Sequence, residues 1–255
     1  MKTDINKQIN SIINKELNTS SVNKFISKVH EDLDLRYNSL NIVVGRPGTS
    51  KTTLFMKTMM KLNYYPNNFH LIIYVSNNES DDTFLKLKQY INIPIVQITY
   101  DNILDTFVQL IQTKEEYWEA HRNKDEGLIE ELGRQLYVKS PFPFNIQTMI
   151  FMDDAVGVVK KKSPWTKFLT QLRHLQCSFW LNLHFFSAEA FDSDLKPQLT
   201  SLYLSSGIPH DKLSYAYRQI NSGATKNEFL EKYMLVKGYQ KLFVDCKDGL
   251  IKIID

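Results

Sequence analysis

The chain has 255 residues, 43% of them hydrophobic and 23% charged, a composition that fits a soluble globular protein with one large α/β domain, alone or with a small appendage. Lysine and arginine total 31 against 28 aspartate and glutamate residues, and the net charge of +3 permits a nucleic-acid partner without indicating one. Cys177 and Cys246 lack CxxC spacing and no apolar run approaches the ~18 residues of a membrane span, which argues against a zinc site, a disulfide framework and a transmembrane segment.

The first 38 residues are expected to form a helical segment that packs on a main domain at residues 39–255. Apolar side chains recur at helical spacing between Ile5 and Leu17, which predicts an amphipathic helix, and a second helix is expected to end near Leu33. The stretch Met1–Asn23 lacks the apolar centre of a signal peptide. We therefore expect a cytosolic protein.

The main domain alternates apolar runs, read as buried strands, with helical segments. A first strand leads directly into Gly45, and a helix at Thr52–Leu62 follows it. A hairpin is expected at about 240–255, because Asp248-Gly249 separates two apolar runs. The expected strands are Leu40–Val44, His70–Val75, Pro94–Tyr100, Thr148–Met152, Ser178–Leu183, a weaker candidate at Ser201–Leu204, Lys241–Asp245 and Leu250–Ile254.

A charged insert interrupts this alternation at Thr113–Lys139. It is rich in Glu, Lys, Arg and Gln, which predicts one or two exposed helices with a break near Gly127, and Pro141 and Pro143 must end the second one. Strands separated by helices favour a mainly parallel sheet covered on both faces. The predicted fold class is therefore α/β.

A glycine-rich segment follows the first strand and opens a helix, which is the context required of a phosphate-binding loop. Backbone N–H groups there point at phosphate oxygens, and the positive end of the helix dipole adds to the attraction. Lys51 would reach the β- and γ-phosphates of ATP, and the Thr52 hydroxyl would be a ligand of Mg²⁺. The predicted nucleotide-binding residues are Gly45, Arg46, Pro47, Gly48, Thr49, Ser50, Lys51, Thr52 and Thr53.

Ser50 departs from the usual loop pattern, which has glycine before the lysine. Its Cβ lies near the phosphates and could weaken binding, whereas its hydroxyl could donate another hydrogen bond. The alternative for the whole segment is an ordinary Gly-Pro turn between a strand and a helix. The Lys51-Thr52 pair and a second motif favour the phosphate-binding loop.

That second motif is an apolar strand that ends in Asp153 and Asp154. Neighbouring strand residues point to opposite sides, so the two carboxylates can divide two tasks. Asp153 would bind Mg²⁺, directly or through a water, opposite Thr52, and Asp154 would orient the water that attacks the γ-phosphate. Solvated acids at a strand end are the alternative, and the loop upstream favours the catalytic assignment.

A polar residue at the end of the next strand would face the γ-phosphate and could sense it. His184 is the first candidate, Asn182 is the competing one, and a satisfied surface histidine is the ordinary alternative. An arginine could stabilise charge on the transferring phosphoryl group. Arg173 is preferred to Arg46 and Arg218, for which a surface salt bridge is the ordinary alternative.

The order of these parts resembles the genome-packaging ATPases of poxviruses, other large DNA viruses and virophages, a branch of the FtsK/HerA superfamily. In that family the paired aspartates precede a Gly-Arg-His segment and a strand ending in a Gln sensor. Here Leu172 stands at the Gly, Arg173 and His174 match, and His184 falls at the Gln. The similarity covers about Ile42 to Ile220 and implies a RecA-like (ASCE) P-loop core, in which another strand separates the loop strand from the aspartate strand.

The resemblance also implies the activity and the partners: Mg²⁺-dependent ATP hydrolysis coupled to translocation of double-stranded DNA into a preformed capsid. The implied partners are a homo-oligomeric ring and a capsid or portal vertex protein, without a membrane, in the host cytoplasm, the viral factory or the virion. Lys160, Lys161 and Lys162 could contact DNA phosphates, or could form a merely solvated basic loop. A nucleotide-switched assembly protein and another P-loop translocase or helicase remain alternatives, whereas a small-molecule kinase is disfavoured because no arginine-rich lid is present.

Overall fold

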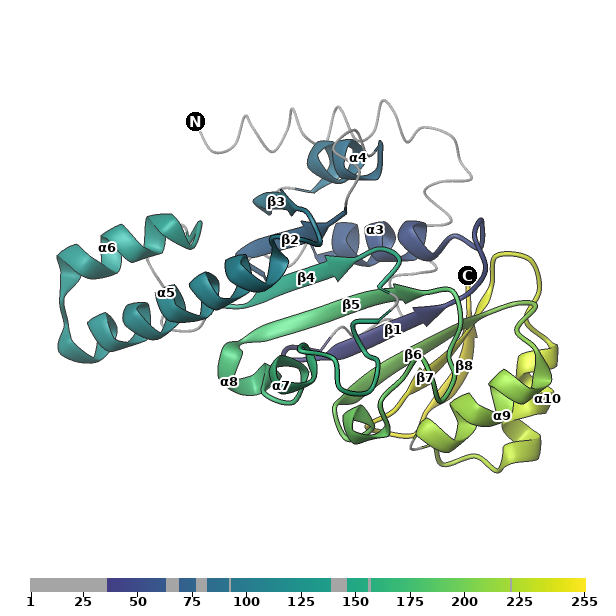
Figure 1. The fold of residues 1–255 in the computed structure, drawn as a ribbon. Coiled ribbons are helices and arrows are strands. Elements are labelled where there is room, and N and C mark those ends of the chain that lie inside the picture. The colour runs from purple at the N-terminus through teal and green to yellow at the C-terminus, as the bar shows by residue number, and fades with distance from the viewer. Residues whose placement is uncertain are drawn as a thin grey trace.

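The computed structural model describes residues 36–62, 69–76, 82–91, 93–138, 146–155, 157–220 and 222–255, and Figure 1 shows helices on both sides of one sheet. The helices and strands follow one another in the order given by the following bounds. They are β1 (Leu40–Val44), α3 (Lys51–Leu62), β2 (Leu71–Val75), α4 (Asp82–Tyr90), β3 (Ile95–Ile98), α5 (Ile103–Asn123), α6 (Glu126–Gln135), β4 (Thr148–Met152), α7 (Thr166–Leu169), α8 (Leu172–Leu175), β5 (Cys177–Leu183), the 3₁₀ turn η1 (Ser193–Leu195), β6 (Leu199–Ser205), α9 (His210–Gln219), α10 (Lys226–Met234), β7 (Lys241–Asp245) and β8 (Ile251–Ile254).

The described sheet has eight strands in the order β3-β2-β4-β5-β1-β6-β7-β8. The six strands from β3 to β6 pair in parallel, and the hairpin β7–β8 adds two antiparallel strands at the edge beside β6. β5 lies between β1 and β4, as the resemblance implied. The predicted α/β class, the mainly parallel sheet and the C-terminal hairpin are therefore confirmed. Parallel order also brings the carboxyl ends of β1, β4 and β5 to one edge.

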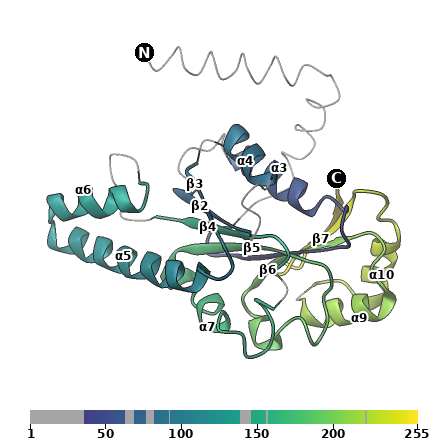
Figure 2. The same ribbon diagram turned by 45° about the horizontal axis from the view of Figure 1, so that its top comes forward.

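Two apolar layers hold the helices on the sheet, because successive strand residues point to opposite faces. On one face Phe107, Trp165 and Phe229 of α5, the segment before α7, and α10 pack over the strands. On the other face, Phe55 of α3 stacks on Phe151 of β4 with ring centroids 3.9 Å apart. Figure 2 shows α3 and α4 on one side and α7 and α9 on the other. The strands are thus buried from both sides.

Most element bounds agree closely with the sequence prediction. The predicted bounds of β1, β4 and β7 are those observed, and the weaker candidate at Ser201–Leu204 is the longer strand β6. The helices expected within residues 1–38 and the break at Pro141–Pro143 lie outside the described residues.

The charged insert is a helical hairpin, as predicted, but it starts earlier and breaks elsewhere. α5 begins at Ile103 rather than near Thr113, because an apolar stripe that includes Phe107 and Leu110 packs on the sheet. The break lies at Lys124, whose φ is 58°, while Gly127 lies in the first turn of α6. No helix in the described part of the chain is long and apolar enough to cross a membrane.

Candidate functional site

The loop between β1 and α3 lies close against β6 and then turns sharply into the helix. A Cβ atom at Gly45 would lie 2.4 Å from Ser205 Oγ, so only glycine fits there without a shift. Gly48 and Ser50 have left-handed φ angles of 77° and 61°. The first N–H groups of an α-helix have no carbonyl partner within the helix, so this loop and the start of α3 form a backbone cradle suited to an anion.

Lys51, the first residue of α3, lies against this cradle. Its Nζ donates hydrogen bonds to the carbonyl oxygens of Gly45 at 2.8 Å and Arg46 at 3.1 Å, and the residue is 7% exposed. Burial lowers the pKa of the Lys51 amine, and the nearby carboxylates of Asp153 and Asp154 partly oppose that shift. The amine therefore lies between the loop backbone and the carboxylates, where phosphate oxygens can replace the two carbonyls as its partners.

The other predicted loop residues lie on the same continuous surface. Arg46, Pro47 and Gly48 are exposed at the tip, and Thr49 Oγ1 donates to the Arg46 carbonyl at 2.8 Å, which closes the turn. Thr53 is exposed on the first turn of α3. The structure thus assembles the predicted loop in one place, and the contribution of each residue to nucleotide binding stays a prediction.

Asp153 connects three segments of the chain. Thr52 Oγ1 donates to Asp153 Oδ2 at 2.9 Å, and Asn182 Nδ2 donates to Asp153 Oδ1 at 3.0 Å. Octahedral Mg²⁺ has oxygen ligands at about 2.1 Å, so neighbouring ligands lie about 3 Å apart. The separation of the Thr52 and Asp153 oxygens fits a shared Mg²⁺, and the hydroxyl and the carboxylate are both hard oxygen ligands of the kind that this ion prefers.

Asp154 lies beside this pair and contacts the second sensor candidate. Its φ is 56°, and its Oδ1 lies 3.1 Å from His184 Nε2. The Asp154 side chain is 64% exposed, so water can reach it. The structure places Asn182 against Asp153 and His184 against Asp154, and both candidates for the sensor therefore remain at the site.

Tyr100 is a site residue that sequence reasoning missed. It follows β3, and its hydroxyl donates to the backbone carbonyl of Asp153 at 2.5 Å. Burial, together with the charges of Asp154 and Asp153, raises the pKa of the Tyr100 hydroxyl, so the group stays protonated and remains a donor. A tyrosine at a strand end carries no local motif, and only the sheet order brings β3 to this edge.

The structure does not bring Arg173 to the site of its own chain. Arg173 lies in α8, at the amino end of β5, whereas the site lies at the carboxyl end of that strand (Figure 1). A strand of seven residues spans about 23 Å. Arg173 therefore cannot contact a nucleotide in its own subunit. Of the other candidates, Arg46 is exposed in the loop, and Arg218 lies over the Tyr215 ring, 5.8 Å from its centroid.

The three consecutive lysines predicted to contact DNA lie in an exposed turn. Lys160, Lys161 and Lys162 are all exposed, and the turn is fixed at its base by a 2.7 Å hydrogen bond from Asp192 N to the Val159 carbonyl. The turn follows the aspartate strand directly in the chain. Its lysine amines are therefore accessible to a polyanion.

Comparisons with known proteins find similarity in structure and not in sequence. No protein family and no curated protein matches the sequence. Among solved structures, the genome packaging NTPase B204 from Sulfolobus turreted icosahedral virus 2, in complex with ATP-gammaS, matches with a TM-score of 0.57 at 16% identity, covering 86% of this chain and 97% of that one. B204 described as the DNA-packaging ATPase from Sulfolobus turreted icosahedral virus matches with a TM-score of 0.57 at 15% identity, covering 87% and 98%.

A second kind of match covers only part of a larger protein. The pCW3 conjugation coupling protein TcpA, in monomer form with ATPgS, matches with a TM-score of 0.54 at 12% identity, covering 86% of this chain and 60% of that one. At these identities the similarity shows the fold alone. The fold is that of P-loop ATPases of the viral packaging and FtsK/HerA type, over most of the chain.

Proposed function

We propose that this protein hydrolyses ATP with Mg²⁺ and couples hydrolysis to the movement of double-stranded DNA during packaging of a viral genome. One observation carries the hydrolytic part: Thr52 of the phosphate loop and Asp153 of a distant strand lie 2.9 Å apart at the mouth of a backbone anion cradle. The DNA part is supported by the two B204 proteins, whose descriptions name genome or DNA packaging and whose whole length this chain nearly covers.

The residues at the site divide the chemistry among them. Loop amides and Lys51 bind the phosphates, and Thr52 and Asp153 hold Mg²⁺, whose charge offsets that of the β- and γ-phosphate oxygens. Asp154 accepts a hydrogen bond from the attacking water. The water oxygen then bonds to the γ-phosphorus, the bond from that phosphorus to the bridging oxygen breaks, and the proton of the water passes to Asp154.

The proposal includes the assembly in which the motor would act. A homo-oligomeric ring on a capsid or portal vertex protein, in the host cytoplasm, the viral factory or the virion, would pass duplex DNA through its centre without a membrane partner. The exposed turn at Lys160–Lys162 supports nonspecific contact with DNA phosphates. The position of Arg173, far from its own site, is compatible with action on the nucleotide of a neighbouring subunit.

The experiment that tests the proposal is an ATPase assay of the purified protein with and without duplex DNA, together with its native mass. Lys51→Ala is expected to abolish nucleotide binding, whereas Asp154→Asn is expected to keep binding and to lose about 100-fold or more in turnover. Lys86→Ala and Asp105→Asn, which change exposed residues on α4 and α5, are matched controls. Wild-type turnover in both site variants would contradict the roles assigned here. Nucleotide-dependent partner binding with little turnover would favour the switch instead.

A further inference from the structure

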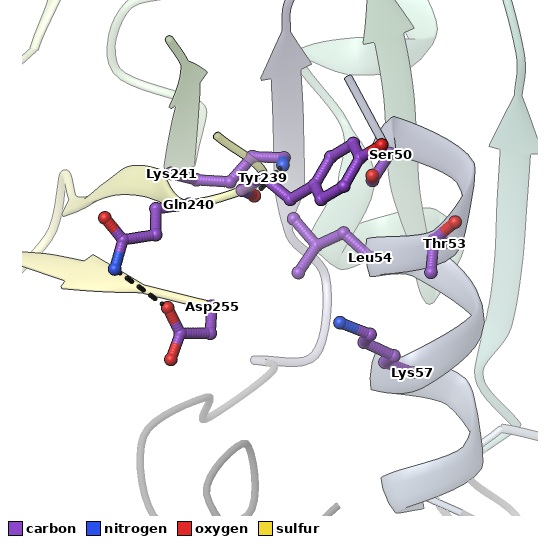
Figure 3. Close-up of a pocket in the computed structure, with 8 residues that line it drawn as sticks. All are labelled: Ser50, Thr53, Leu54, Lys57, Tyr239, Gln240, Lys241 and Asp255. Carbon is purple, nitrogen blue, oxygen red and sulfur yellow. Dashed lines mark hydrogen bonds between the residues drawn. The ribbon is translucent and has the colours of Figure 1, made fainter. Parts of the chain in front are cut away.

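A cavity of about 480 Å³ lies beside the phosphate loop, on the side away from the carboxylates. It opens between α3 and the end of the β7–β8 hairpin, and Figure 3 shows its lining. Its size falls within the usual range of small-molecule sites, about 300–1,000 Å³. The residues that line it are Ser50, Thr53, Leu54, Lys57, Tyr239, Gln240, Lys241 and Asp255.

One stripe of α3 faces this cavity. Ser50, Thr53 and Lys57 follow at spacings of three and four residues, which places them on one side of the helix. Thr52 lies on another side and contacts Asp153. The sheet order agrees, since β4 with its carboxylates and β7 beside the cavity lie on opposite sides of β1. A triphosphate whose γ end lies at the carboxylates therefore directs its other end toward the cavity.

Tyr239 is an exposed aromatic residue on a fixed turn. Its side chain is 71% exposed, and in Figure 3 its ring points toward Ser50. Hydrogen bonds hold the turn around it, from Lys237 N to Gln240 Oε1 at 3.1 Å and from Lys241 Nζ to the Tyr239 carbonyl at 2.7 Å. A ring held in this way offers a flat apolar face on which a nucleobase can stack at little entropic cost.

The rest of the lining is part apolar and part polar. Leu54 supplies an apolar surface, and Figure 3 shows the Lys57 side chain reaching from α3 toward the cavity. Gln240 Nε2 donates to Asp255 Oδ1 at 3.0 Å, which places an amide and a carboxylate at the rim. Apolar faces with a few polar groups are typical of sites for a sugar and a base.

We propose that this cavity is the nucleoside subsite, in which the base of a purine nucleotide stacks on Tyr239 and its ribose and α-phosphate lie along Thr53 and Lys57. The inference rests on the proposed binding of ATP at the phosphate loop. It adds that affinity comes from two halves, with the loop binding the phosphates and the turn before β7 binding the nucleoside.

The test compares the affinities of the full chain for Mg-ATP and for inorganic tripolyphosphate with Mg²⁺, by isothermal titration calorimetry. Tripolyphosphate carries the phosphate chain without a nucleoside, so it reports the loop alone. Tyr239→Ala is expected to weaken ATP binding about 10- to 100-fold, to leave tripolyphosphate binding unchanged, and to leave the melting temperature unchanged because the ring is exposed. Tyr239→Phe keeps the ring and is expected to bind ATP like the wild type.

The outcomes separate this inference from the proposed function. Tyr137→Ala, which removes an exposed tyrosine that follows α6, is the matched control. Wild-type protein that binds tripolyphosphate as tightly as ATP, or a Tyr239→Ala variant that binds ATP normally or weakens both ligands equally, would overturn the nucleoside subsite while leaving ATP binding at the loop in place. Failure of wild type to bind either ligand, or unchanged binding in Lys51→Ala, would instead refute the proposed function and this inference with it.

Discussion

Ser50 and its neighbours show how single residues shape the site. A left-handed φ costs a residue with a Cβ about 1–2 kcal/mol relative to the right-handed region, and Ser50 adopts 61° directly before Lys51. The departure noticed in the sequence is therefore a backbone departure as well as a chemical one. The loop and the aspartate pair could be predicted because their residues are close together in the sequence. Tyr100 could not, because its partner Asp153 is reached only through the folded sheet.

Substitutions at Ser50 should separate backbone strain from side-chain chemistry. Ser50→Gly removes the Cβ, and we expect the free energy of unfolding to rise by about 0.5 kcal/mol, because relief of strain exceeds the entropy that glycine gains in the unfolded chain. Ser50→Val is expected to lower it by about 2 kcal/mol or more, since a β-branched residue tolerates this φ poorly. Urea unfolding measures both, and Ser50→Ala controls for the hydroxyl. A loss of stability in Ser50→Gly would show that the φ is not strained.

Lys241 should make stability depend on pH in an alkaline window. Burial lowers the pKa of its amine to about 8 from the ordinary 10.5, and the charges of Lys57 and Lys51 lower it further; Lys57 is shifted by burial to about 8 as well. Between these values the unfolded chain binds protons that the folded chain has released, so the free energy of unfolding should rise with pH from about 8 to about 10. Chemical unfolding at several pH values measures this rise.

Lys241→Met should reduce that rise, because it removes one of the two groups with a lowered pKa. Lys86→Met, at an exposed position of α4, should leave it unchanged. Raised tyrosine pKa values, such as that of the buried Tyr203, act in the opposite sense only above about pH 10. An undiminished rise in Lys241→Met would show that this amine does not titrate in the window.

At the scale of elements, strands were predictable and short helices were not. β1 and β4 are apolar runs bounded by polar residues, and their bounds could be read directly. α7 and α8 have four residues each, too few for a helical period to show, and α5 carries an apolar stripe that the charged residues after Thr113 obscured. Local pattern thus identified elements whose burial is continuous.

Tyr100 connects two elements, the turn after β3 and the turn after β4, and its removal should affect turnover more than binding. Tyr100→Phe deletes the hydroxyl that donates to the Asp153 carbonyl, at an expected cost of about 1 kcal/mol in stability. Because that turn positions Asp153 and Asp154, we expect kcat for ATP hydrolysis to fall several-fold while Kd for ATP stays unchanged. Steady-state kinetics and calorimetry measure the two quantities. Tyr137→Phe, at an exposed position, is the control, and a weaker Kd with normal kcat would assign Tyr100 to binding instead.

For the whole molecule, the order of motifs carried the prediction of the fold, and contacts between distant segments limited the prediction of the site. The resemblance implied one strand between β1 and β4, and β5 lies there. The cavity beside the phosphate loop could not be predicted, because Thr53 and Tyr239 approach each other only after the hairpin joins the sheet edge beside β6. The same limit applies to Arg173, whose place at the far edge follows from the direction of β5.

The position of Arg173 predicts complementation between subunits if the protein works as a ring. A residue about 23 Å along β5 from its own site can act only on the nucleotide of a neighbour. Arg173→Ala should then keep ATP binding and lose turnover, and Lys51→Ala should lose both. In a mixture of the two inactive variants, a site with intact Lys51 can meet a neighbour with intact Arg173, so the ATPase assay should show activity that neither variant has alone. A mixture of Arg173→Ala with Arg122→Ala, an exposed position on α5, controls for simple dilution. Full turnover in Arg173→Ala alone would remove this arginine from the mechanism, because no neighbour would then need it.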